Sequence, residues 1–177
     1  IPGGKGREIG NSPISIAVPQ KSGFPLFLDI ALSAVAALKV EQAKRDGKTI
    51  PDTWVVDKNG FPSTDPNVFF DGGAAQPMAG HKGYGLAMMI EILTGVMSGG
   101  AILHELTSWL WDLPTPNKVS HCFIVIDISK FMDDAAFLDR LEEYTNAIHG
   151  TPLREDSKAI FVPGEMENTR YKEALKS

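Results

Sequence analysis

The sequence is poor in cysteine, in basic charge and in long apolar runs. Cys122 is the only cysteine among 177 residues, so no disulfide forms within the chain, and we expect a cytoplasmic protein because such usage suits a reducing compartment. The 17 Lys and Arg against 22 Asp and Glu, with no run of basic residues, argue against nucleic acid as a partner, because binding phosphates needs a basic face. The longest apolar run, at 86–97, is shorter than the roughly 20 residues of a membrane span and contains Glu91, so we expect no membrane partner.

The spacing of apolar residues predicts an α/β chain. Strands are expected where small and β-branched residues alternate or run together, and helices where apolar residues recur every three or four positions. The helix expected at 83–98 is apolar nearly all round and the run at 121–128 is apolar almost throughout, so we expect both to be buried. The predicted strands are 13–18, 26–29, 54–56, 121–128 and 159–162, and the predicted helices are 31–45, 83–98, 101–109, 134–148 and 165–176.

The motif that points most clearly to ligand binding is Gly80-His81-Lys82-Gly83-Tyr84-Gly85, at the start of the strongest predicted helix. Its glycines allow close backbone approach and unusual dihedral angles. A helix N-terminus attracts anions, and Lys82 adds a cation that suits a phosphate or a carboxylate. Because His81 and Lys82 are costly to place beside an apolar helix unless they meet a partner, we favour a binding function for them.

Three further stretches lie at junctions between predicted elements. Asp29 stands between a strand and the helix expected at 31–45, where a carboxylate either caps the helix or contacts a ribose hydroxyl or a catalytic group. The small side chains of Ala31 and Ser33 leave room for a ligand there. Taken alone, Gly10-Asn11-Ser12-Pro13 is an ordinary turn and Pro163-Gly164-Glu165-Met166-Glu167 an ordinary helix start.

Several other kinds of site are disfavoured by the motifs that the sequence does not contain. No Gly-x-Gly-x-x-Gly fingerprint, Walker A loop or Gly-x-Ser-x-Gly elbow occurs. His104, His121 and His149 have no second ligand at metal-binding spacing, so we expect no metal site. Cys122 begins an apolar run, which favours a small buried residue over a catalytic thiol.

The ordered set of motifs resembles the malate/L-lactate dehydrogenase family, which includes ureidoglycolate, sulfolactate and diketogulonate dehydrogenases. Each motif is common alone, but their order and spacing together span nearly the whole chain. The matching segments are Gly10-Asn11-Ser12-Pro13-Ile14, Leu28-Asp29-Ile30-Ala31-Leu32-Ser33, Lys48-Thr49-Ile50-Pro51, Asp57-Lys58-Asn59-Gly60, Gly80-His81-Lys82-Gly83-Tyr84-Gly85-Leu86 and Pro163-Gly164-Glu165.

The resemblance implies that the chain is the C-terminal half of such an enzyme, because family members are roughly twice this long. It implies a three-layer mixed α/β sheet with helices on both faces, a non-Rossmann nicotinamide-binding fold, and a homodimer. It further implies a cofactor-binding domain at 1–150, with a C-terminal strand and helix at 151–177 that pack on the rest. The missing N-terminal half would then be a partner, and this portion alone would be inactive.

The activity implied is NAD- or NADP-dependent interconversion of a small 2-hydroxy acid, such as malate or lactate, and its 2-oxo acid. The family's proton-donating histidine lies upstream of Ile1, so no catalytic histidine is assigned, and Asp29 is a supporting candidate. Gly-Asn-Ser-Pro replaces the family's Gly-Thr-Asn-Pro turn, which leaves the hydrogen-bond roles there open. The implied cofactor contacts are Asn11, Pro13, Leu28, Asp29, Ile30, Ala31, Leu32, Ser33, Ala34, His81, Lys82, Gly164, Glu165 and Met166.

Two other functions stay open from the residues themselves. One is a non-catalytic α/β module that binds a small molecule, and the other is a phosphate-sugar transferase that uses Lys82 at its helix start. The choice between NAD and NADP is also open, since Lys39, Lys44 and Arg45 either reach a 2′-phosphate or form a solvated helix face. The substrate is undetermined among malate, lactate, sulfolactate, ureidoglycolate and cyclic imino acids.

Overall fold

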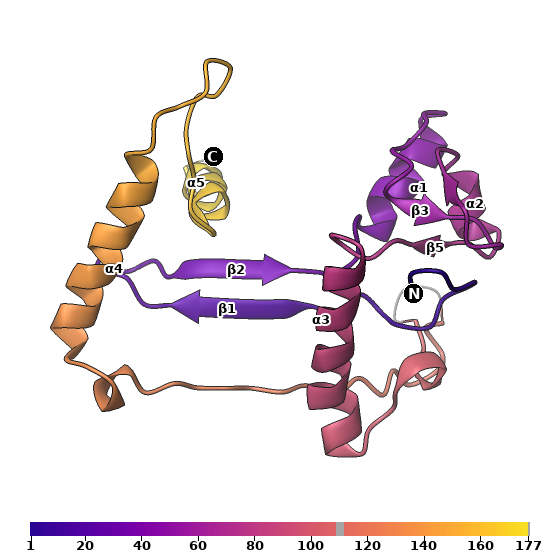
Figure 1. The fold of residues 1–177 in the computed structure, drawn as a ribbon, viewed down its shortest axis with the longest axis horizontal. Helices are drawn as coiled ribbons and strands as arrows, with labels where there is room; N and C mark the ends of the chain where they lie inside the picture. Colours follow the sequence, from indigo (N-terminus) through magenta and orange to yellow (C-terminus); the bar gives the residue numbers. More distant parts are fainter. Residues whose placement is uncertain (109–111, 177) are drawn as a thin grey trace. The chain divides into compact units, whose positions relative to one another are not determined.

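The computed structural model describes residues 1–108 and 112–176. It divides into two compact units that alternate along the chain. Unit 1 consists of Ile1–Ile14 and Ile30–Phe123, and unit 2 of Ser15–Asp29 and Ile124–Ser177. Helices and small sheets occur together in the described residues (Figure 1), which confirms the mixed α/β class.

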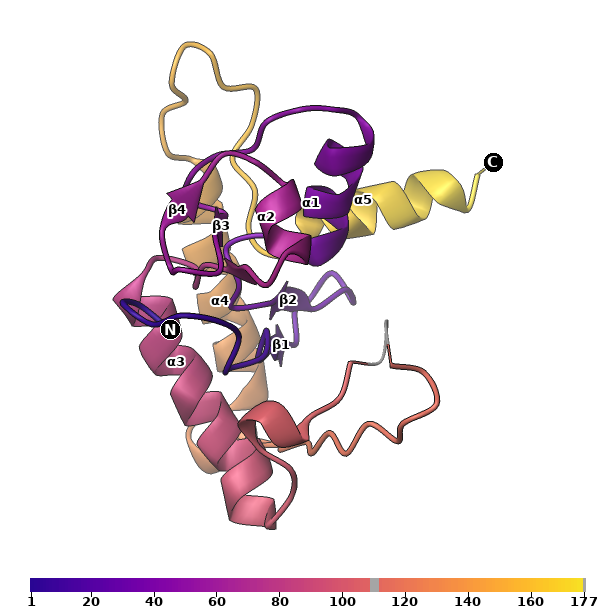
Figure 2. The same cartoon turned by 90° about the vertical axis from the view of Figure 1, so that its right-hand side faces the viewer.

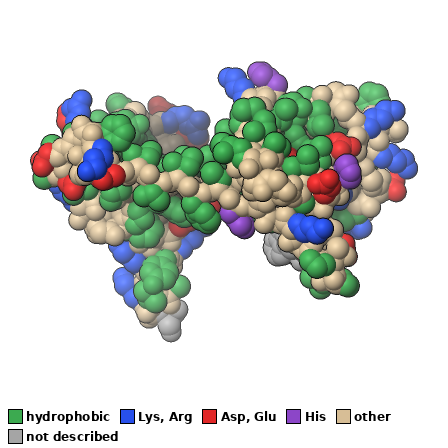
Figure 3. All heavy atoms as spheres, turned by 90° about the horizontal axis from the view of Figure 1, so that it is seen from below, with side chains coloured by type: hydrophobic (Ala, Val, Ile, Leu, Met, Phe, Trp, Pro, Cys, Tyr) green, Lys and Arg blue, Asp and Glu red, His purple; other side chains and the backbone are tan. Residues whose placement is uncertain are grey.

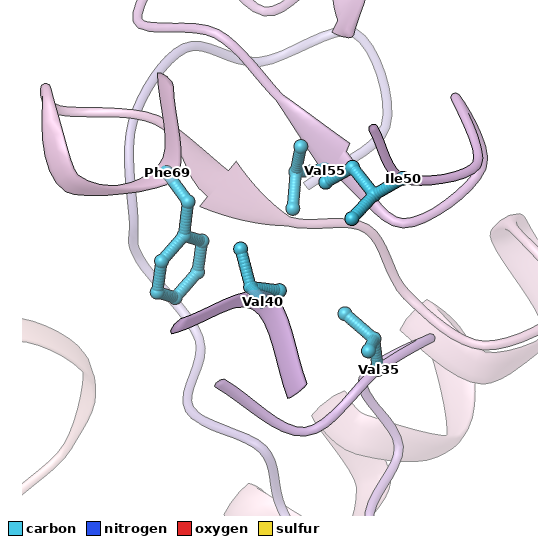
Figure 4. Packing of buried hydrophobic residues seen from close by; sticks show 5 residues of the cluster. All are labelled: Val35, Val40, Ile50, Val55 and Phe69. Atoms are coloured by element: carbon cyan, nitrogen blue, oxygen red, sulfur yellow. The ribbon is translucent and has the colours of Figure 1, made fainter. Parts of the chain in front are cut away.

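Unit 1 is built around a small antiparallel sheet in the order β4-β3-β5. The central strand β3 (Val55–Val56) pairs with β4 (Pro62–Ser63) on one side and with β5 (Ala74–Ala75) on the other. Helices α1 (Ala37–Arg45) and α2 (Asn67–Phe70) contribute side chains to the same core. Five side chains point toward one another there (Figure 4): Val35, Val40, Ile50, Val55 and Phe69.

An N-terminal arginine ties the first residues of unit 1 to this core. The Arg7 guanidinium lies 4.4 Å from the centre of the Phe69 ring, and its Nε donates to the carbonyl of Gly73 at 2.7 Å. A second N–H of the same guanidinium donates to the carbonyl of Phe69. Burial lowers the pKa of Arg7 from its usual value, because removal from water disfavours the charged form. The contacts with two carbonyls and a ring offset that loss.

The helix α3 (His81–Glu91) confirms the helix expected at the glycine motif, and it continues as a π-helical turn, η1 (Ile92–Val96), seen as one rod in Figure 2. The expected burial of this helix is wrong for the described residues. Only its small residues Gly83, Ala87 and Gly95 are buried. Several large apolar side chains are exposed instead: Leu86, Met88, Met89, Ile92, Leu93 and Val96. Apolar composition favours burial, but the surface that would cover this helix is not among the described residues.

Unit 2 contains two helices and an antiparallel hairpin, of which only the end residues Ile14 and Ile30 belong to unit 1. Strands β1 (Ile14–Val18) and β2 (Leu26–Ile30) run in opposite directions (Figure 1). Helix α4 (Asp134–His149) begins where expected, because the Asp133 carboxylate accepts the N–H of Ala136 at 3.0 Å and so caps the helix. The last helix, α5 (Glu165–Ala174), follows Gly164.

Three further predictions of secondary structure are wrong or only partly right. The helix expected at 31–45 begins at Ala37, because residues 31–34 pair with another segment. No strand forms at 121–128 or 159–162 in the described part of the chain, where only a short 3-10 helix, η3 (Ile128–Lys130), follows the first of these runs. Cys122 is therefore exposed and not buried. The helix expected at 101–109 is reduced to a 3-10 turn, η2 (Leu103–Glu105), and residue 109 lies outside the described residues.

The described residues lack two features, a helix that could span a membrane and a cluster of metal ligands. No helix there is both long and apolar enough to cross a membrane. Nor does any group of three or more His, Cys, Asp or Glu side chains within residues 1–108 and 112–176 have the arrangement of a metal site.

Candidate functional site

Main-chain hydrogen bonds join three of the predicted segments in unit 1. The Leu32 N–H donates to the carbonyl of Asn11 at 2.8 Å, and the N–H of Met78 donates to the carbonyl of Leu32 at 2.8 Å. Leu32 therefore bridges the turn at 10–13 and the loop that leads into α3. These bonds bring together segments separated by up to about 70 residues, which no local propensity could do.

The loop before α3 is also anchored to the sheet of unit 1. The N–H of Ala34 donates to the carbonyl of Gln76 at 2.7 Å, and Ser33 forms an antiparallel bridge with Pro77. The Gln76 side-chain amide donates to the carbonyls of Asp52, at 2.5 Å, and Val55, at 3.1 Å. A loop held on both sides in this way presents the start of α3 in one position.

The entry into α3 is a tight turn that depends on small residues. Ala79 and Gly80 have φ values of 51° and 62°, and Gly80 is the N-cap of the helix. Gly83 packs directly on the preceding loop, because a Cβ at this position would lie 1.9 Å from the carbonyl oxygen of Met78. The helix start is thereby pressed against the loop that Leu32 holds.

The first turn of α3 is suited to an anion. The first helical bond runs from the N–H of Tyr84 to Gly80, and the N–H groups of residues 81–83 have no acceptor among the described residues. Such free donors and the helix dipole attract negative charge. His81 and Lys82 are exposed at this end, and neither side chain makes a hydrogen bond or ion pair within the described part of the chain. The imidazole and ammonium groups are thus free to meet a ligand.

The predicted residues on the segment at 28–34 take different positions. Leu32 is buried, Ile30 and Ala34 are half-buried, and Ala31 is exposed. The Ser33 hydroxyl donates to the carbonyl of Val35 at 3.1 Å, which turns the chain toward α1. Asn11 and Pro13 are exposed beside this segment in unit 1.

Asp29 does not cap a helix, which corrects one of its two interpretations. Helix α1 begins at Ala37, and its N-cap Ala36 receives no side-chain hydrogen bond. Asp29 lies in β2 next to Leu28, is exposed, and its carboxylate accepts no hydrogen bond from any described residue. The interpretation in which Asp29 meets a ligand or a catalytic group stays a prediction.

Unit 2 gathers the remaining predicted residues around the start of α5. Gly164 is buried with a φ of 92°, and a Cβ there would lie 3.1 Å from the Cβ of Phe27, so glycine is required. The N–H of Phe27 donates to the carbonyl of Pro163 at 3.1 Å, which places Gly164 beside β2 and hence near Leu28. Met166 follows with an exposed side chain.

Glu165 has structural partners that the sequence did not indicate. Its Oε2 accepts the N–H of Val162 at 2.9 Å and lies 3.0 Å from Nε2 of His149. The carboxylate thereby connects the start of α5 to the end of α4 and to the loop that precedes α5. This pair lines a cleft of unit 2, to which Lys21 and Glu142 also contribute.

Sequence reasoning missed the two residues that organise the site in unit 1, Gln76 and Met78. Their role lies in main-chain carbonyls and N–H groups, which every residue carries, so residue type gives no signal. The one available signal was Gly83, a glycine inside a predicted helix, which marks a close backbone approach.

Two of the three cations considered for a 2′-phosphate have partners within the chain. Lys44 lies 4.7 Å from the centre of the Phe70 ring, and Arg45 lies 3.5 Å from Glu41.

Comparisons with known proteins agree on one family. The family model described as malate/L-lactate dehydrogenase matches residues 1–177. The malate dehydrogenase of Pyrococcus horikoshii is 34% identical over 176 residues, which cover 92% of this chain and 46% of that protein. The ureidoglycolate dehydrogenase (NAD(+)) of Escherichia coli K12 is 33% identical over 171 residues, which cover 96% of this chain and 48% of that protein.

Solved structures give the same result for the fold. The sulfolactate dehydrogenase from Methanocaldococcus jannaschii matches with a TM-score of 0.87 at 30% identity, over 98% of this chain and 49% of that one. The chain therefore spans about half the length of the curated relatives and solved structures it matches.

Proposed function

This chain belongs to the malate/L-lactate dehydrogenase family, and we propose that it supplies the nicotinamide-binding part of an oxidoreductase that interconverts a small 2-hydroxy acid and its 2-oxo acid. The relatives are named as dehydrogenases of malate, sulfolactate and ureidoglycolate. Their names support the oxidation of a 2-hydroxy acid as the reaction class. They differ in substrate, so activity assays must identify the substrate of this chain.

One observation carries the proposal: the bridge from Asn11 through Leu32 to Met78, which holds the segment at 31–34 against the entry of α3. At that entry the N–H groups of residues 81–83, the imidazole of His81 and the ammonium of Lys82 are all without partners among the described residues. Donors and a cation gathered at a rigid helix start fit the pyrophosphate of a dinucleotide.

Each part of the chain then has a defined task. A bound nicotinamide exchanges a hydride with the carbon that bears the substrate hydroxyl. The first turn of α3 holds the phosphates, and the small residues Ala31 and Ser33 let the cofactor approach the backbone. Asp29, exposed in β2, stays a candidate for a supporting role in catalysis. The proton-transferring histidine belongs to the half of the family fold that this chain does not span.

The finer features remain parts of the proposal. The complete enzyme would have the three-layer, non-Rossmann sheet expected from the family and would form a homodimer. It would act in the cytoplasm, and its domain boundary in this chain would lie near residue 150. Lys39 is the remaining candidate for a 2′-phosphate, because Lys44 and Arg45 have intrachain partners. NADP selectivity would therefore depend on Lys39 more than on its two neighbours.

Thermal denaturation with added cofactor tests the proposal. A ligand that binds the folded state raises the melting temperature, so NADH or NADPH should raise it while inorganic phosphate alone should have a smaller effect. Lys82→Gln should reduce the rise, whereas Lys58→Gln, which removes an exposed cation paired with Asp71 at 3.1 Å, should leave it unchanged. A response to phosphate without any response to either dinucleotide would support a transferase instead, and no response to any of them a different binding module.

A further inference from the structure

The turn between β3 and β4 carries a chemically labile pair, Asn59-Gly60, for which the proposed function has no task. Residues 57–60 join the two antiparallel strands, which Figure 2 shows side by side. Asn59 is exposed to water. The main-chain nitrogen that follows an asparagine can attack the side-chain amide of that residue, and glycine hinders this attack least because it has no side chain.

The fold requires glycine at the second position of this pair. Gly60 has a φ of 88°, and a Cβ there would lie 2.6 Å from the carbonyl oxygen of Gly4. A larger residue at position 60 would protect the asparagine, but it would strain the turn and displace the N-terminal segment. The reactive pair is therefore a consequence of the turn itself.

The hydrogen bonds of the turn restrain the same reaction. The N–H of Gly60, whose nitrogen is the nucleophile, donates to the carbonyl of Asp57 at 3.0 Å. The Asp57 carboxylate accepts the N–H groups of Asn59, at 2.8 Å, and of Phe61, at 2.9 Å. The nitrogen of Gly60 is therefore released for attack only when the turn opens locally. The rate of reaction at Asn59 then depends on how often that opening occurs.

We propose that Asn59 is a site of spontaneous deamidation and that opening of the turn sets its rate. The nitrogen of Gly60 loses its proton and forms a bond to Cγ of Asn59, and the side-chain nitrogen leaves as ammonia. Water then opens the resulting succinimide ring at one of its two carbonyls, and the product is aspartate or isoaspartate. One water is consumed and one ammonia is released, so the reaction needs neither an oxidant nor a reductant.

Loss of the amide removes a donor from the turn and adds a negative charge. Hydrogen bonds from the main chain of Phe61 foremost, and from the main chain and side chain of Asn59, lower the pKa of Asp57, which is therefore ionised at neutral pH. A carboxylate at residue 59 cannot donate to Asp57 and repels it. Isoaspartate also lengthens the main chain beside β3, in which Val55 is fully buried. Modification should therefore lower the stability of unit 1.

Peptide mapping by mass spectrometry of the folded chain, stored at mildly alkaline pH, tests the proposal. Asn146 is the internal control, because it is also exposed but is followed by Ala147 within α4. We expect Asn59 to be converted at least about tenfold faster than Asn146. In water enriched in heavy oxygen, each product should gain a heavy oxygen atom. Acidic and basic side chains reach the surface in Figure 3, and an added carboxylate there should shift the chain in ion exchange.

Variants of two acidic residues test whether the turn sets the rate. Asp57→Ala removes the carboxylate that accepts the N–H groups of Asn59 and Phe61, and it should speed the loss of the amide at least about threefold. Asp52→Ala removes an exposed carboxylate that accepts no hydrogen bond from a described residue, and it should leave the rate unchanged. Hydrogen exchange in α1 reports in each sample whether unit 1 is folded.

A synthetic peptide of residues 55–63 supplies a reference without the folded turn, so the test stands even where Asp57→Ala does not fold. Its Asn59 should be converted at least about threefold faster than that of the folded chain. Equal rates at Asn59 and Asn146 in the folded chain would overturn the site. A rate in the peptide no higher than in the folded chain would overturn control by the turn. None of these readouts involves a nicotinamide, so the outcome is independent of the proposed function.

Discussion

Gly83 and Met78 lie in backbone contact at the start of α3: a Cβ on residue 83 would stand 1.9 Å from the Met78 carbonyl oxygen. Gly83→Ala must therefore displace the loop before α3 or the helix itself. We expect a loss of about 1–3 kcal/mol in the free energy of unfolding, the usual cost of overpacking. Urea denaturation measures it, and dinucleotide binding should weaken in the same variant.

Gly85→Ala is the matched control for that variant. Residue 85 lies two positions further along α3, and a Cβ there would have no atom within 4 Å. Because glycine is a poor helix former, this change should raise the free energy of unfolding by about 0.5–1 kcal/mol. Equal destabilisation by the two alanines would show that the contact with Met78 is not what requires glycine at 83.

Features that depend on neighbouring residues could be predicted from the sequence. Helix α4 was predicted at its correct start because Asp133 caps it, and capping involves only neighbouring residues. The glycine motif likewise located the start of α3. These features are local, so a single sequence contains them.

Burial and strand formation depend on distant partners. The strands predicted at 13–18, 26–29 and 54–56 are confirmed as β1, β2 and β3, but the strands predicted at 121–128 and 159–162 and the expected burial of α3 were wrong. Large apolar side chains of α3, such as Leu86 and Met89, and those of 123–126 are exposed, because no described residues cover them. The segment at 31–34 pairs with residues 76–78 through main-chain groups, so its helical spacing is overridden. The family resemblance supplied the candidate site residues, while the bridge at Leu32 became visible only in the structure.

Glu165 should stabilise unit 2 through two contacts. Its carboxylate accepts the N–H of Val162 and contacts His149, so Glu165→Ala should lower the free energy of unfolding by about 0.5–1.5 kcal/mol. Glu167→Ala is the control, since Glu167 lies in the same first turn and its side chain makes no hydrogen bond to a described residue. Guanidinium denaturation followed by far-ultraviolet circular dichroism compares them. Equal losses would assign the effect to the helix dipole alone.

Asp57 should make the stability of unit 1 depend on pH. Its carboxylate accepts the N–H groups of Phe61 at 2.9 Å and Asn59 at 2.8 Å, and these bonds, that of Phe61 foremost, lower its pKa from the ordinary value of 3.8. A lowered folded-state pKa stabilises the protein fully above the unfolded-state value, and the contribution is lost as the pH falls through the folded-state value.

Asp57→Asn should therefore destabilise the protein near neutral pH and lose that difference in acid. Urea midpoints at about pH 7 and about pH 3 measure the change. Asp52→Asn is the control, because the Asp52 carboxylate accepts no hydrogen bond from a described residue. A gap between wild type and Asp57→Asn that stays constant across this range would show that the turn does not depend on the ionised carboxylate.

Hydrogen exchange with and without dinucleotide tests the central proposal most directly, because it locates the cofactor on the chain. NADH or NADPH should slow exchange at the amides of 81–83, whose N–H groups are without acceptors among the described residues, and at 31–34 beside them. Exchange in α2 of the same unit should stay unchanged. Unaltered exchange at 81–83 in the folded protein, at dinucleotide concentrations that saturate other family members, would contradict a nicotinamide site at the start of α3.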